Sequence, residues 1–70
     1  MSNKTIGEYI KNLRISQNIS TSEIAKNLTI SEAEYIKCES GEASIYVDDL
    51  KSIAGMLSVK ESTLIEKYKD

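Results

Sequence analysis

Apolar side chains recur at helical spacing in five segments of the chain, and short polar stretches separate these segments. Near the N-terminus, Ile6, Ile10 and Leu13 fall at i, i+4 and i+7, the spacing of one face of an amphipathic helix. The longest stripe consists of Val47, Leu50, Ile53, Ala54 and Leu57. The pattern predicts an all-α fold in one domain spanning residues 1–70, with helices over approximately residues 4–17, 21–28, 32–40, 47–57 and 61–68.

Two serines mark the starts of the second and third predicted helices. Ser20 is followed three residues later by Glu23, and Ser31 in the same way by Glu34. In such a capping box the serine oxygen accepts a backbone N–H at the helix start, and the glutamate reaches back to the N–H of the serine. Gly41 ends the third helix, as glycine commonly does. The spacing of the two serines leaves room for one short helix and a tight turn, which is typical of a helix-turn-helix.

The composition excludes several classes of protein. The chain has 70 residues, one cysteine and no histidine, so neither a disulfide framework nor a structural zinc site is expected. We expect no metal, no cofactor and no catalysis, because there is no Ser–His–Asp set, no Gly-rich phosphate loop and no cluster of metal ligands. No apolar run approaches the roughly 18 residues of a membrane span, and no signal peptide is visible. A cytoplasmic protein without membrane contact is the expectation.

Charge is distributed unevenly along the chain. The net charge is −2, but residues 1–30 carry +2, residues 31–49 carry −5 and residues 50–70 carry +1. Affinity for DNA depends on Lys and Arg side chains that release counterions from phosphates, and a basic patch is the usual footprint. This chain is basic in its N-terminal part, over residues 1–30. It is acidic where the second helix of a helix-turn-helix would lie in a DNA groove.

A set of short motifs recurs in order along most of the chain. The motifs are Ile6-Gly7-Glu8, Leu13-Arg14, Ile19-Ser20, Glu23-Ile24-Ala25, Leu28-Thr29-Ile30-Ser31, Glu39-Ser40-Gly41, Leu50 and Ile53-Ala54. In this order and at these intervals, over about residues 5–66, the chain resembles the Cro/C1-type (Xre, lambda-repressor-like) helix-turn-helix family. The resemblance implies a compact five-helix DNA-binding domain with the helix-turn-helix at its second and third helices.

The resemblance also implies roles for particular residues. Arg14 and Glu39 match an ion pair that braces the first helix against the third. Contacts with double-stranded DNA would fall at Thr21, Ser31, Glu32, Ala33, Ile36, Lys37, Glu42 and Ser44, with Lys11 and Lys26 near phosphates. The C-terminal part commonly mediates dimerisation in this family, so Val59, Ile65 and Tyr68 are expected at a homodimer interface.

The chain departs from the family pattern at the proposed DNA face. The family often has Gln at the position of Thr21, and basic or polar residues at the positions of Glu32 and Glu42. It usually has Gly at the position of Thr29, where a β-branched residue is disfavoured if φ is positive. An altered or strained turn is therefore expected there.

Several side chains have more than one interpretation. Lys37 is the best candidate for a phosphate or guanine contact, or it is a solvated surface lysine. Glu32 either accepts from cytosine N4 or stabilises the helix start. Cys38 is expected to act as a small buried hydrophobe rather than a redox switch. Asp48 and Asp49 are expected to stabilise the first turn of the fourth helix.

Two functional hypotheses follow. The first is a sequence-specific transcriptional regulator of the phage- or plasmid-repressor kind, which would bind an operator as a dimer with residues 32–40 in the major groove. The alternative is a helix-turn-helix fold used as a protein-interaction module, an antirepressor or partner subunit, because the face of the third helix is acidic. A third possibility is the DNA-binding head of a longer protein.

Overall fold

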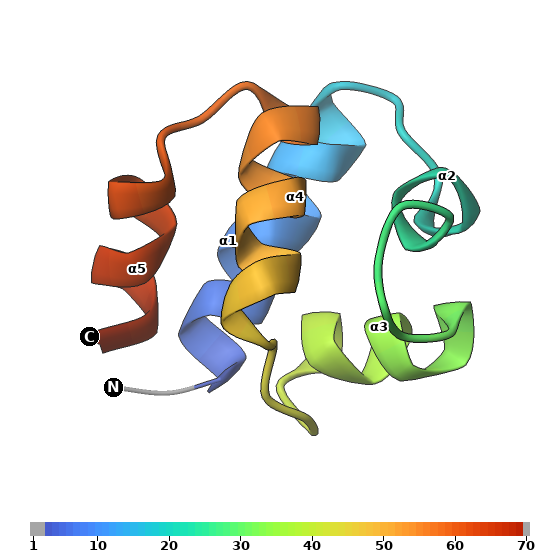
Figure 1. The fold of residues 1–70 in the computed structure, drawn as a ribbon, viewed down its shortest axis with the longest axis horizontal. Coiled ribbons are helices and arrows are strands. Elements are labelled where there is room, and N and C mark those ends of the chain that lie inside the picture. Colours follow the sequence, from blue (N-terminus) through green and yellow to red (C-terminus); the bar gives the residue numbers. More distant parts are fainter. Residues whose placement is uncertain (1–2, 70) are drawn as a thin grey trace.

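The computed structural model describes residues 3–69, and all its regular elements are helices (Figure 1). They are α1 (Asn3–Ser16), α2 (Thr21–Ala25), α3 (Glu32–Ser40), α4 (Val47–Leu57) and α5 (Glu61–Lys69). Helix α3 packs on α1 and α2, whereas α5 packs on α1 and α4. Figure 1 shows α5 on the opposite side of the molecule from α2 and α3. The predicted all-α fold is therefore confirmed, and α2 and α3 are consecutive packed helices.

The helix boundaries follow the local signals in the sequence. Ser20 accepts a hydrogen bond from the N–H of Glu23 and Ser31 accepts one from the N–H of Glu34, and both glutamates complete their capping boxes. Gly41 ends α3 with a φ of 88°, in the left-handed region that glycine adopts without steric cost. Helix α2 ends at Ala25, before the predicted end at Leu28, because tight turns carry the chain from there toward α3.

The core receives apolar side chains from every helix. Its buried members are Ile6, Ile10, Ile24, Tyr35, Cys38, Ile45, Leu50, Ile53, Ala54, Leu57 and Leu64. The predicted inner stripe of α4 is correct except at its first member, since Val47 is exposed. Ile45 in the preceding loop is buried instead, so the chain enters the core before α4 begins rather than at its first residue.

Helices α1 and α3 approach each other closely at Gly7. A β-carbon at this position would collide with the backbone carbonyl oxygens of Cys38 and Glu39. Glycine is therefore required here by the distance between the two helices, although it lies within a helix where it is otherwise unfavourable. This close contact fixes where the C-terminal half of α3 lies on α1.

Candidate nucleic-acid interface

Helix α3 has a buried face and an exposed face. Tyr35 and Cys38 are buried against the rest of the domain. The exposed face carries most of the residues expected at DNA, namely Ser31, Glu32, Ala33, Ile36 and Lys37. The helix thus presents these five residues on the side that faces solvent.

An ion pair joins α1 to the end of α3. Arg14 Nε donates to Glu39 Oε2 at 2.6 Å, Nη2 donates to Oε1 at 3.1 Å, and Nη1 donates to the backbone oxygen of Ile19 at 2.8 Å. The Arg14 side chain is 12% exposed and that of Glu39 is 7% exposed. Hydrogen bonding to Glu39 raises the pKa of Arg14 above its ordinary value. The pair implied by the family resemblance is present, and it holds α3 in a fixed orientation on α1.

The phenol of Tyr35 lies beside this ion pair. Burial, reinforced by the nearby carboxylate of Glu39, raises the pKa of Tyr35 far above its usual range. Within residues 3–69 the buried hydroxyl oxygen has no hydrogen bond of good geometry. Tyr35 therefore acts here mainly as a large neutral core residue, and it carries no exposed group that would contact DNA.

A hydrogen bond crosses from α2 to α3 at the start of both helices. Thr21 Oγ1 donates to Glu32 Oε2 at 2.7 Å, and both residues belong to the expected DNA face. Because Glu32 is held by Thr21, its carboxylate has a role in bracing the two helices that the sequence did not reveal. This bond brings the starts of α2 and α3 together on one surface.

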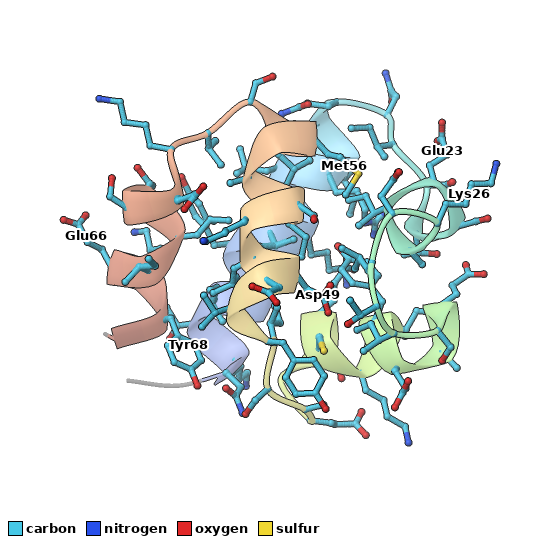
Figure 2. All side chains as sticks on the ribbon, viewed as in Figure 1. Glu23, Lys26, Asp49, Met56, Glu66 and Tyr68 are labelled. Atoms are coloured by element: carbon cyan, nitrogen blue, oxygen red, sulfur yellow. The ribbon has the colours of Figure 1, made fainter. Side chains whose placement is uncertain are left out.

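The turn between α2 and α3 is fixed by a buried carboxylate from α4. Asp49 Oδ1 accepts the backbone N–H of Thr29 at 2.9 Å, and Oδ2 accepts its hydroxyl at 2.7 Å. Asp49 is 1% exposed, and Figure 2 shows its side chain between α4 and the segment leading into α3. The expectation that Asp49 serves only as a first-turn charge of α4 is therefore incomplete, because its carboxylate ties α4 to the turn.

Thr29 itself does not adopt a left-handed conformation. Within the described residues, the non-glycine positions with positive φ are Asn18 and Ser58. The expected departure at the family's glycine position is thus an altered turn rather than a strained one. The threonine hydroxyl contributes a hydrogen bond to Asp49 that a glycine would lack.

The loop after α3 lies against the N-terminal end of α1. Ser44 Oγ accepts a hydrogen bond from Asn3 Nδ2 at 3.1 Å, and Glu42 Oε2 accepts one from Ser40 Oγ at 2.9 Å. The Sγ of Cys38 lies 3.6 Å from the backbone oxygen of Ser44, and burial raises the pKa of this thiol. Cys38 is buried as expected for a small hydrophobe.

The lysines expected at phosphates lie on different elements. Lys37 is exposed on α3, and Lys11 is exposed on α1, where it lines a shallow hollow together with Ser40 at the end of α3. Lys26 follows α2 and extends into solvent beside Glu23 in Figure 2. The three exposed lysines thus lie on α1, directly after α2 and on α3.

The residues expected at a dimer interface differ in exposure. Ile65 is exposed on α5, whereas Val59 and Tyr68 are partly buried and pack against the core of their own chain. Next to Tyr68 in the same helix, Lys67 Nζ lies 5.1 Å from the centre of the Tyr9 ring, a cation–π contact that holds α5 on α1. Of the three residues, Ile65 is the most exposed, with 39% of its surface accessible.

Comparison of the chain with protein-family models, curated proteins and solved structures found no match. Within residues 3–69, no group of His, Cys, Asp and Glu side chains is arranged to hold a metal ion. In the same part of the chain, no helix combines the length and apolar character needed to cross a membrane.

Proposed function

We propose that the protein is a lambda-repressor-like, sequence-specific DNA-binding regulator that places α3 in the major groove of an operator. The observation that carries the proposal is the arrangement of α2 and α3. Both helices begin with a capping box, residues 26–31 join them through tight turns, and α3 buries one face while exposing the other. These features support the proposal, because helix-turn-helix proteins present the exposed face of the second of two consecutive helices to base edges.

Three bonded contacts give α3 the rigidity that base recognition needs. The Arg14–Glu39 pair fixes α3 on α1, the Thr21–Glu32 bond joins the helix starts, and Asp49 holds the turn at Thr29. A recognition surface is effective when it is fixed before binding, because fewer degrees of freedom are lost on association. Each of these contacts lies away from Lys37, which stays exposed for a base or phosphate.

The charges around α3 set the expected character of binding. Lys11, Lys26 and Lys37 supply three positive charges per protomer, against the exposed carboxylates of Glu32 and Glu42. A dimer would then make about six phosphate contacts, and each contributes about −0.9 to the slope of log affinity against log salt concentration. We therefore propose a modest affinity for DNA.

We also propose that the protein dimerises through α5 and the loop before it, at Val59, Ile65 and Tyr68. Its proposed place of action is the cytoplasm.

The test is fluorescence anisotropy of the full chain with DNA from around its own gene, measured across a series of salt concentrations. The proposal expects stronger binding than to scrambled DNA and a slope no steeper than about −6. Lys37→Ala should weaken specific binding about fivefold or more, as loss of a base contact does. Lys51→Ala is the matched control, because Lys51 is an exposed lysine on α4.

Equal affinity for both DNAs at low salt would reject sequence-specific recognition. An equal loss of DNA affinity in the Lys37→Ala and Lys51→Ala variants would show that charge alone, and not the position of α3, determines binding. Sedimentation of the free chain and of the DNA complex reports the oligomeric state independently of affinity. An Ile65→Glu chain that sediments like the unaltered chain would remove α5 from the interface.

A further inference from the structure

A groove lies between the C-terminal half of α3 and the loop that leads to α4. Its volume is about 290 Å³, and its walls include Ile30, Glu34, Lys37, Ala43 and Tyr46. Pockets that enclose drug-sized molecules span roughly 300–1,000 Å³. This groove is at the small end of that range, so a protruding side chain fits it better than a cofactor does.

Exposed apolar side chains occur in and beside the segments that form the groove, and one of them, Tyr46, lines it. Tyr46 is 64% exposed, and the neighbouring Val47 is 63% exposed at the first residue of α4. Ile36, on the outer face of α3, is 49% exposed. Tyr46 precedes α4 without a side-chain capping hydrogen bond, so α4 does not need this ring at its start. An exposed tyrosine beside exposed aliphatic residues is typical of an interaction surface.

Two carboxylates, Glu34 and Glu42, and one amine, Lys37, line the groove, and the stretch of chain that contains it is acidic. Four carboxylates are exposed between residues 31 and 49, and Lys37 is the exposed amine in the same stretch; the carboxylates are Glu32, Glu34, Glu42 and Asp48. The other two acids of this stretch are buried, where Glu39 bonds Arg14 and Asp49 bonds Thr29. The carboxylates of Glu34 and Glu42 favour cationic side chains in a partner that enters the groove.

We propose that this acidic groove, formed by Ile30, Glu34, Lys37, Glu42, Ala43 and Tyr46, binds a peptide segment of another protein in which a large apolar side chain is flanked by Lys or Arg. The apolar side chain lies between Ile30, Ala43 and Tyr46. The flanking cations pair with Glu34 and Glu42. The proposal does not depend on DNA binding, since these contacts require only the groove and its charges.

The experiment selects peptides from a random library displayed on phage, with the full chain immobilised and competing salt present. The proposal expects enriched peptides that combine one Leu, Ile, Phe or Trp with neighbouring Lys or Arg. The enriched peptide is then synthesised, labelled and titrated with the protein. Tyr46→Ala and Glu42→Lys should each weaken its binding about tenfold, as loss of an anchor or of a complementary charge does.

Matched variants separate the groove from the rest of the surface. Ile15→Ala removes an exposed aliphatic side chain on α1, and Glu66→Lys reverses an exposed charge on α5, which Figure 2 shows pointing outward on the far side of the molecule. Both should bind the peptide like the unaltered chain, and Tyr46→Phe should retain most of the affinity. Circular dichroism of each variant verifies that the helices are intact.

Three results would overturn the proposal. The first is that no peptide is enriched above its level on a surface without the protein. The second is that acidic peptides are enriched. The third is a peptide whose affinity is unchanged by Tyr46→Ala and Glu42→Lys. Loss of DNA affinity in Tyr46→Ala, without any peptide binding, would assign the groove to the DNA interface instead. Peptide binding by a chain that does not bind DNA would reject the proposed regulator and retain the groove.

Discussion

The hydrogen bonds between Thr29 and Asp49 predict a large effect from a small change. Thr29→Val keeps the shape of the side chain but removes the hydroxyl that donates to Asp49 Oδ2 at 2.7 Å. A hydrogen bond to a charged group contributes about 1.5–3 kcal/mol. Asp49 is 1% exposed while Thr29 lies at the surface, so water replaces the lost donor only in part. We therefore expect Thr29→Val to lower the free energy of unfolding by about 2 kcal/mol.

This loss is measurable because the domain is small. A 70-residue chain has a total stability of roughly 4–10 kcal/mol at 0.05–0.15 kcal/mol per residue. A loss of 1 kcal/mol shifts the melting temperature of such a domain by about 4–8 °C. Urea unfolding followed by circular dichroism, with melting curves in parallel, gives both quantities. Thr29→Ser, which retains the hydroxyl, should remain close to the unaltered chain.

A double-mutant cycle with Asp49→Ala identifies the interaction itself. The cycle should return a coupling energy above about 0.5 kcal/mol, as expected for residues in contact. Thr63→Val makes the same chemical change on α5, away from Asp49, and serves as the control. Ordinary surface substitutions change the free energy of unfolding by no more than about 0.5 kcal/mol. If Thr29→Val lowers it by no more than that, the turn does not depend on this bond.

Three further predictions concern the contacts of α3. Gly7→Ala should destabilise the fold by about 1–3 kcal/mol, because the added β-carbon meets the α3 backbone. This loss outweighs the preference of about 1 kcal/mol that helices have for alanine over glycine. A variant that is more stable in urea unfolding would contradict this packing. Arg14→Met should cost about 3 kcal/mol by leaving Glu39 buried without a cation, and Glu39→Gln in the same background should restore part of the loss. At mildly alkaline pH, Cys38 should react with a thiol reagent far more slowly in the folded chain than in the chain unfolded in urea. The reason is that burial raises the pKa of the thiol in the folded chain. Equal rates would show that the thiol is accessible.

Local sequence signals determined where the helices lie. The two capping boxes fix the starts of α2 and α3, and Gly41 fixes the end of α3, through hydrogen bonds that span only a few residues. These signals can be predicted without knowledge of the fold. Periodicity likewise identified Ile53 and Leu57 as core residues. The pairing of Arg14 with Glu39 lies beyond any local pattern, and its expectation came from the family resemblance.

Tertiary structure decided the contacts between residues that are distant in sequence. Val47 satisfies the helical stripe but is exposed, since periodicity does not report where the neighbouring elements end, and Ile45 is buried in its place. Asp49 appeared as one of two adjacent helix-start charges, and only the packing of α4 against the turn distinguishes it from Asp48. The groove at Tyr46 is formed by three segments together. The sequence by itself determined the helices and, apart from the end of α2, their approximate bounds, because those depend on neighbouring residues, whereas the site depends on how the helices pack.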